Sequence, residues 1–106
     1  MDLKQLQQKT VEIDNQFPHK FTKTTLALDL VEEVGELAQA ILIVEKVKLT
    51  NDPKKQRSIA DVANALGDIL FDLLAIADKY GLDMEAEYVK VMAELEGRIK
   101  QGEFDW

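Results

Sequence analysis

The chain has 106 residues, of which 20 are acidic and 13 basic, so its net charge is −7. The length predicts a single domain over residues 1–106, and the acidic balance argues against a nucleic acid polymer as a partner, since such proteins need a basic face. The absence of cysteine excludes disulfides, thiol nucleophiles and cysteine-based zinc sites. The chain has one histidine, His19, and one serine, Ser58, so a Ser-His-Asp triad would require these two single residues to lie together. We do not expect such a triad.

No apolar run approaches the roughly 20 residues that a membrane span needs. The first ten residues, MDLKQLQQKT, are polar and lack the apolar core of a signal peptide. We therefore expect a cytoplasmic protein with no membrane partner.

Apolar residues recur at helical spacing along almost the whole chain. Breaks are expected at residues 15–18, around the polar stretch at 48–55, and at Gly81, which is suited to end a helix. The Asn-Asp-Pro run at residues 51–53 is typical of a helix start, and Asp83 can cap a further helix. The pattern predicts four helices, at residues 2–15, 22–47, 51–80 and 83–100, followed by an irregular tail at residues 102–106.

The expected fold is therefore all-α, a four-helix-type bundle with two long central helices. Both central helices are apolar around much of their circumference, which is more than one amphipathic stripe requires. Residues Leu30, Val34 and Ile41 belong to the stripe on the first of them. We expect this surplus to be buried by helix packing against another subunit, in a homodimer or homotetramer.

The first central helix carries a cluster of acidic side chains. Glu32 and Glu33 lie four and three residues before Glu36, and Asp29 lies one turn earlier, so all four share one side of the helix. Like charges placed in this way repel each other by roughly a few tenths of a kcal/mol per pair. A solvated helix face more often mixes both signs, whereas a bound divalent cation would remove the repulsion.

The second central helix repeats this feature, because Asp61, Asn64, Asp68 and Asp72 fall on one face at about 100° per residue. If the two helices pack antiparallel, the two acidic faces can confront each other. Mg²⁺ suits such a site, since it takes oxygen ligands and keeps water molecules that substrate phosphates can replace. A solvated surface is the alternative explanation of either cluster taken alone.

Two segments carry a resemblance to a known family. They are LVEEVGELA at residues 30–38 and ALGDILFDLLAIADKYGLD at residues 65–83, which resemble the MazG-like nucleotide pyrophosphohydrolases of the all-α NTP pyrophosphatase superfamily. The resemblance covers about residues 22–87 and implies a helical bundle that forms dimers or tetramers. It also implies Mg²⁺-dependent hydrolysis of a nucleoside triphosphate between the α and β phosphates, which yields the monophosphate and pyrophosphate and would clean the nucleotide pool.

The family's Glu-Glu-x-x-Glu element matches Glu32, Glu33 and Glu36. The resemblance implies that Glu33, Glu36 and Asp68 hold Mg²⁺, with Mn²⁺ as a substitute. It gives Glu32 the task of completing the metal shell or of orienting and deprotonating the attacking water. Glu32 and Glu33 are thus the expected catalytic residues.

The family's second element, Glu-x-x-Asp, matches Asp68 but has Ala65 where the family has glutamate. Three residues on the same face are candidate compensating ligands, namely Asp61, Asn64 and Asp72. Two hypotheses follow. The chain is an active pyrophosphohydrolase, or it is a catalytically degenerate helical protein that binds a nucleotide, a metal or a partner.

Candidate phosphate contacts are drawn from the basic residues, chiefly Lys79 and Arg98, and beside them Lys54, Lys55 and Arg57. A solvated surface charge is the more common explanation for each of these residues. Asp78 stands where the family frequently has asparagine, which is a second departure near the expected nucleotide contacts. No position indicates which base would be recognised.

Overall fold

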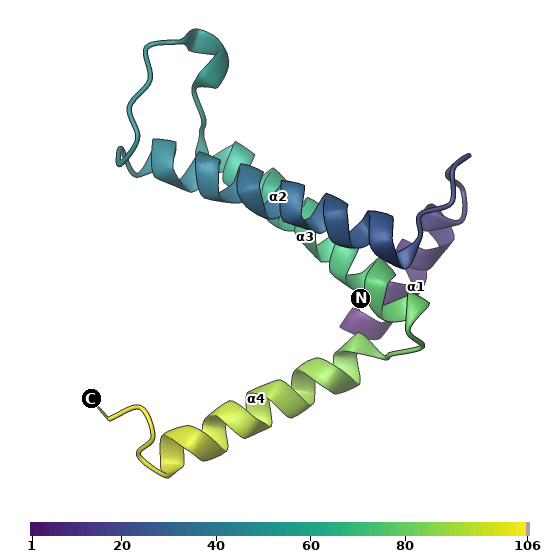
Figure 1. The fold of residues 1–106 in the computed structure, drawn as a ribbon. Helices are drawn as coiled ribbons and strands as arrows, with labels where there is room; N and C mark the ends of the chain where they lie inside the picture. The colour runs from purple at the N-terminus through teal and green to yellow at the C-terminus, as the bar shows by residue number, and fades with distance from the viewer. Residues whose placement is uncertain (106) are drawn as a thin grey trace.

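The computed structural model describes residues 1–105 and contains four α-helices (Figure 1). They are α1 (Leu3–Asp14), α2 (Lys23–Val44), α3 (Ile59–Lys79) and α4 (Met84–Lys100), with a short 3₁₀ helix, η1 (Pro53–Lys55), between α2 and α3. The described residues contain no strand. The all-α prediction and the number of helices are confirmed.

Polar residues cap the helices at the positions that the sequence indicates. The Asp2 carboxylate accepts a hydrogen bond from the backbone N–H of Gln5 at 2.8 Å, and the Asp83 carboxylate accepts one from Glu85 N–H at 3.0 Å. Thr22 caps α2, with its hydroxyl accepting from the backbone N–H of Thr25 at 3.1 Å. Because such caps satisfy backbone donors that the first turn leaves free, these three starts lie within about two residues of their predicted places.

The predicted start of the third helix at residues 51–53 is wrong. Pro53 begins only the single turn of η1, after which Gln56 adopts an extended backbone with ψ 145°. The helix proper starts after Ser58, whose backbone N–H donates to the Asp61 carboxylate at 2.7 Å. A capping pair nearer the apolar periodic segment therefore prevails over the proline.

The second helix ends at Val44 and not at residue 47. Lys46 takes a left-handed backbone conformation with φ 59°, and the backbone N–H groups of Val47 and Lys48 both donate to the carbonyl of Leu42. These bonds satisfy carbonyl groups at the helix end, as in a Schellman-type C-cap.

α2 and α3 pack side by side and run antiparallel, as Figure 1 shows. The buried apolar residues of this pair are Leu26, Ala40 and Ile43 from α2 and Ala65, Leu74, Ala75 and Ala77 from α3. α1 packs against α3. The side-chain amide of Gln7 ties it to the α3–α4 turn, donating to the Leu82 carbonyl at 2.9 Å and accepting from Met84 N–H at 3.0 Å.

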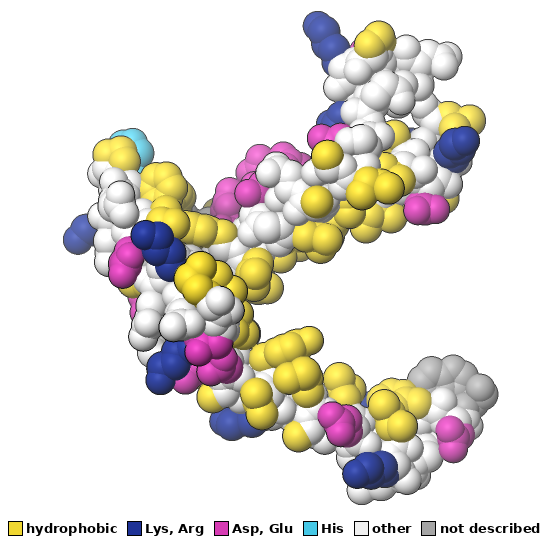
Figure 2. Space-filling model, turned by 180° about the vertical axis from the view of Figure 1, so that it is seen from behind, with side chains coloured by type: hydrophobic (Ala, Val, Ile, Leu, Met, Phe, Trp, Pro, Cys, Tyr) yellow, Lys and Arg dark blue, Asp and Glu magenta, His cyan; other side chains and the backbone are white. Residues whose placement is uncertain are grey.

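α4 packs against α1 at its start and then diverges from the α2–α3 pair (Figure 1). No residue of α4 is buried, and the radius of gyration is 17.2 Å, against about 13 Å for a compact domain of this length. Figure 2 shows apolar side chains along the α2–α3 pair and along α4, on the sides of these two parts that face each other. Val34 and Ile41 of the predicted stripe remain 47% and 42% exposed, so much apolar surface is left without a partner inside one chain.

None of the described helices combines the length and the apolar character that crossing a membrane would require.

Candidate functional site

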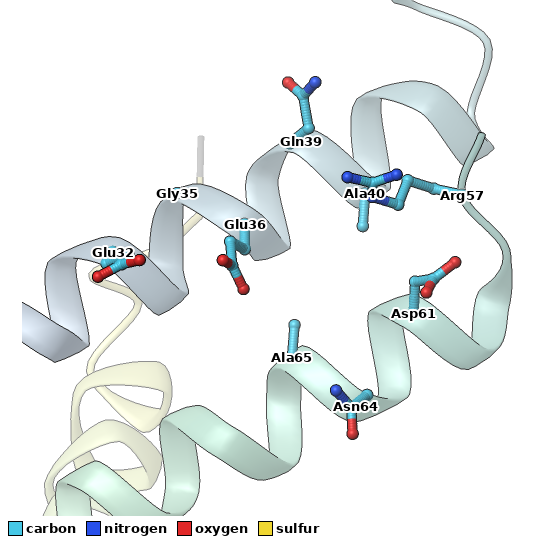
Figure 3. A pocket seen from close by; sticks show the side chains of 9 residues that line it. All are labelled: Glu32, Gly35, Glu36, Gln39, Ala40, Arg57, Asp61, Asn64 and Ala65. Carbon is cyan, nitrogen blue, oxygen red and sulfur yellow. The ribbon is translucent and has the colours of Figure 1, made fainter. Parts of the chain in front are cut away.

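The antiparallel packing of α2 and α3 places acidic residues of both helices at two cavities. The first, here called the Ala65 cavity, has a volume of about 560 Å³ and is lined by Glu32, Gly35, Glu36, Gln39, Ala40, Arg57, Asp61, Asn64 and Ala65 (Figure 3). The second, here called the Asp72 cavity, has a volume of about 320 Å³ and is lined by Phe17, Phe21, Leu26, Asp29, Glu33, Asp68, Phe71 and Asp72. The confrontation of acidic faces that the sequence predicts is therefore present, but it is divided between two places.

In the Asp72 cavity, four carboxyl groups meet three aromatic rings. The rings of Phe21 and Phe71 both lie edge-on to Phe17, with centroids 5.5 and 6.5 Å away. Apolar rings on one side of the cavity reduce the screening of nearby charges by water. The carboxyl groups consequently influence each other strongly.

Asp72 is the most deeply buried acid, with 4% of its surface exposed. Its Oδ2 atom is fully buried and has no hydrogen-bond partner among the described residues. Burial raises the pKa of Asp72 to about 7, helped by a hydrogen bond with Asp29 and by repulsion from Asp29, Glu33 and Asp68. The proton of Asp72 is thus held to near-neutral pH.

Glu33 shares this environment from α2. Its Oε2 atom is also buried without a partner in the part of the chain that the structure describes. Burial raises the pKa of Glu33, and so does the repulsion of nearby acids, which are Glu36, Asp68, Asp29 and Glu32 in decreasing order of effect. Because Glu36 has the largest effect among them, Glu33 links the two cavities electrostatically.

The Ala65 cavity presents its acids differently. Figure 3 shows Glu36 of α2 directed toward α3, where Ala65 offers only a methyl group. Asp61 is occupied as a helix cap by the N–H of Ser58. Asn64 lies with its amide nitrogen 3.5 Å from the Asp68 carboxylate, so it supports an acid and does not present a free oxygen there.

Arg57 also borders the Ala65 cavity, at the end where the η1 loop enters α3 (Figure 3). Its guanidinium donates to the carbonyls of Lys54 and Gln56 at 3.3 and 2.9 Å, which fixes it to the loop. No sequence pattern distinguishes Arg57 from the other basic residues, because its position depends on the loop conformation. It is the basic residue that lines a cavity together with the glutamates.

The two basic residues favoured from the sequence lie elsewhere. Lys79 forms an ion pair with the buried Asp14 at 3.5 Å. Arg98, on the diverging α4, makes two hydrogen bonds to Glu103 at 2.9 and 2.7 Å and stacks on Phe104. Neither is brought to the acidic cavities within one chain, and their role as phosphate contacts stays a prediction.

Gly35 of α2 and Gly67 of α3 lie where the neighbouring helices do not approach closely. A Cβ atom at either position would meet nothing within 4 Å. Gly35 lines the Ala65 cavity, so there the missing side chain leaves open space beside Glu36.

The donor set suits Mg²⁺, because it consists of carboxylate oxygens, two of which are buried and unpartnered. As the side chains stand, however, no three acidic or histidine side chains within residues 1–105 converge closely enough to hold a metal ion. The chemistry of the residues therefore fits a divalent cation, while binding requires rotation of side chains into other rotamers.

Comparison with known proteins places these features in a family. The family model for the MazG nucleotide pyrophosphohydrolase domain matches residues 21–102. The structure resembles the crystal structure of iMazG from Vibrio DAT 722, with a TM-score of 0.58 and 25% sequence identity over 94% of this chain and 97% of that chain. No curated protein sequence matches the chain.

Proposed function

The chain belongs to the family of MazG nucleotide pyrophosphohydrolase domains, and we propose that it hydrolyses nucleoside triphosphates to the monophosphate and pyrophosphate in the presence of Mg²⁺. The observation that supports this proposal is the pair of buried, unpartnered carboxylate oxygens on Glu33 of α2 and Asp72 of α3, two residues that line the same cavity. Carboxylates kept in this state suit a site that receives a cation and, with it, phosphate groups.

We propose a separate role in this reaction for each acidic residue. Glu33, Glu36 and Asp68 would hold the cation, which would supply a lowered pKa for water and a positive charge against the phosphates. Glu32, exposed at the rim of the Ala65 cavity, orients the attacking water and accepts its proton. The water oxygen forms a bond to the α-phosphorus while the bond to the bridging oxygen breaks, and pyrophosphate leaves.

Arg57 is the basic group best placed to meet the departing charge, since it borders the same cavity as Glu32 and Glu36. A guanidinium can bind phosphate oxygens with two parallel hydrogen bonds. Cleaning of the nucleotide pool in the cytoplasm is the role that we propose for this reaction.

We further propose that the chain acts as a homodimer or homotetramer. Val31, Leu66 and Leu70 of the α2–α3 pair and Val89 and Leu95 of α4 are between 41% and 71% exposed. Apolar faces of this extent are usually covered in an assembly, and two copies could cover both at once, each packing its α4 against the α2–α3 pair of the other. The mass of the purified protein in solution would test this directly.

The reaction is tested with a panel of ribo- and deoxyribonucleoside triphosphates, with and without Mg²⁺, by measuring pyrophosphate and monophosphate. We expect equal amounts of both, only with metal. Glu33→Gln and Glu36→Gln should each abolish turnover, whereas Glu94→Gln, an exposed change of the same kind on α4, should not. Retained activity in both of the first two variants would overturn the site assignment.

One observation favours the second candidate function, a catalytically degenerate binding protein. The buried Ala65 contributes no oxygen to its cavity. If the folded chain is silent across the panel and Ala65→Glu produces hydrolysis, the native chain is a binding protein.

A further inference from the structure

We propose that this chain holds its divalent cation on the Asp72 side of the site, with Asp72 and Asp29 supplying the carboxylates that Ala65 cannot. The cation-binding set would then be Asp29, Glu33, Asp68 and Asp72, and it would replace the assignment given above by leaving out Glu36, which lines the Ala65 cavity. This inference rests on the proposed function only in taking the cation to be divalent, and it concerns where on the α2–α3 interface the cation lies.

The antiparallel register brings these four residues together as two pairs. Asp29 and Glu33 are one turn apart on α2, and Asp68 and Asp72 are one turn apart on α3. Because the helices run in opposite directions, Asp29 meets Asp72, with which it shares a hydrogen bond, and Glu33 meets Asp68, whose charge acts on it. All four line one cavity, although among the described residues their side chains do not converge as they stand, so binding would need them to turn toward a common point.

Asp72 itself points to a ligand. It is 4% exposed, its Oδ2 atom has no partner among the described residues, and it lies in a cavity lined by three phenylalanines. An apolar residue at this position would leave no polar atom buried against those rings, whereas a buried carboxyl oxygen without a partner destabilises the fold. A cation bound between the helices removes that cost and the mutual repulsion of the four acids.

The other candidate compensating ligands are less suited. Asp61 uses its carboxylate to accept from the N–H of Ser58 at 2.7 Å. Asn64 lies with its amide nitrogen toward Asp68. Both border the Ala65 cavity and not the Asp72 cavity, so they flank the site one to two turns away along α3.

The test uses the full chain stripped of metal and titrated with Mn²⁺ alone, without nucleotide, with bound and free Mn²⁺ measured by electron paramagnetic resonance. Asp72→Asn should weaken Mn²⁺ affinity about tenfold or more. Asp61→Asn should leave it within about twofold, as should Asp78→Asn, which removes one charge from an exposed position of the same helix. Circular dichroism confirms that each variant is folded.

A second variant distinguishes the loss of a metal ligand from a general effect of Asp72→Asn on packing. Ala65→Glu combined with Asp72→Asn should restore much of the lost Mn²⁺ affinity, because it returns a carboxylate to the other side of Asp68. Unchanged affinity in Asp72→Asn, or a loss confined to Asp61→Asn, would overturn the proposal. So would an Asp72→Asn variant that loses nucleotide affinity while keeping Mn²⁺ affinity, since the cavity would then bind a base and not a cation.

The outcome is separate from that of the proposed function. Hydrolysis of triphosphates by the native chain with unchanged Mn²⁺ affinity in Asp72→Asn would refute the cation position and leave the activity standing. Loss of Mn²⁺ affinity in Asp72→Asn without hydrolysis by the native chain would support the cation position and refute the activity.

Discussion

Asp72 of α3 and Asp29 of α2 bring their carboxyl groups to one cavity at the helix interface, where a hydrogen bond between them helps to raise the pKa of Asp72. Two ionised carboxylates have only acceptors, so this bond needs one proton. Asp72 holds it, because its pKa is raised to about 7 by burial first, and then by its bond to Asp29 and the nearby acids. The metal-free interface is therefore sensitive to pH in a way that an apolar helix pair is not.

In the metal-free protein, this pKa makes stability fall as pH rises. The folded-state pKa of about 7 lies above the ordinary value of 3.8, so the contribution of Asp72 is fully present below about pH 4 and is lost as pH rises toward 7. The Asp72→Asn variant should lack this dependence and be more stable than the native chain at pH 8, by on the order of 2 kcal/mol. Urea unfolding at pH 5 and pH 8 with a chelator measures both. A native chain as stable at pH 8 as at pH 5, relative to the variant, would contradict the prediction.

Addition of Mg²⁺ should reverse this loss. A ligand that binds only the folded state stabilises it by RT ln(1 + [L]/Kd), which is about 2.7 kcal/mol at a hundredfold excess over Kd. We expect a rise in Tm with increasing Mg²⁺ at pH 8 and a smaller rise in Asp72→Asn. A helical bundle without a metal site would show the same Tm at all Mg²⁺ concentrations.

The sequence predicts the helices well because caps and apolar spacing are local. Thr22 and Asp83 begin α2 and α4 as expected, and the acidic faces do confront each other. The start of α3 is missed because two local patterns compete, Pro53 and the Ser58–Asp61 cap, and only the loop conformation decides between them.

The division of the acids between two cavities lies beyond sequence reasoning for a different reason. Asp61 and Asp72 both fall close to Asp68 around the helix axis, so periodicity treats them as equivalent. They differ in depth and in neighbours, since Asp72 faces Asp29 and three aromatic rings whereas Asp61 caps a helix. That difference depends on how far α3 is shifted along the axis of α2. Sequence spacing within one helix does not predict this shift. Predictions for the tail at Trp106 fall outside the described residues.

Lys79, which pairs with Asp14 and borders neither acidic cavity, can be tested for a structural role against a role in binding phosphate. Asp14 is 9% exposed and its Oδ1 atom is buried without a partner within residues 1–105, so the Lys79 ion pair is its main compensation. Lys79→Met should lower the free energy of unfolding by about 1–3 kcal/mol and leave KM for the triphosphate unchanged. A raised KM with unaltered stability would instead identify Lys79 as a phosphate contact. Lys9→Met, which removes an exposed i,i+3 pair with Glu12, is the matched control and should change stability by less than about 0.5 kcal/mol.

The apolar face of α4 tests the assembly. Met92 and Leu95 are 39% and 41% exposed and belong to a helix in which no residue is buried, so each leaves apolar surface that a second copy could cover. If a second copy covers this face, a charge there would be placed in a desolvated interface at a cost of several kcal/mol, and Leu95→Glu should convert the oligomer into monomers in light-scattering measurements. Lys90→Glu, a charge change at an exposed residue of the same helix, is the control and should leave the mass unchanged. A native chain that is already monomeric at high concentration would refute the assembly, and α4 would then be expected to lose helicity on its own, because isolated helices of about this length are marginal in water.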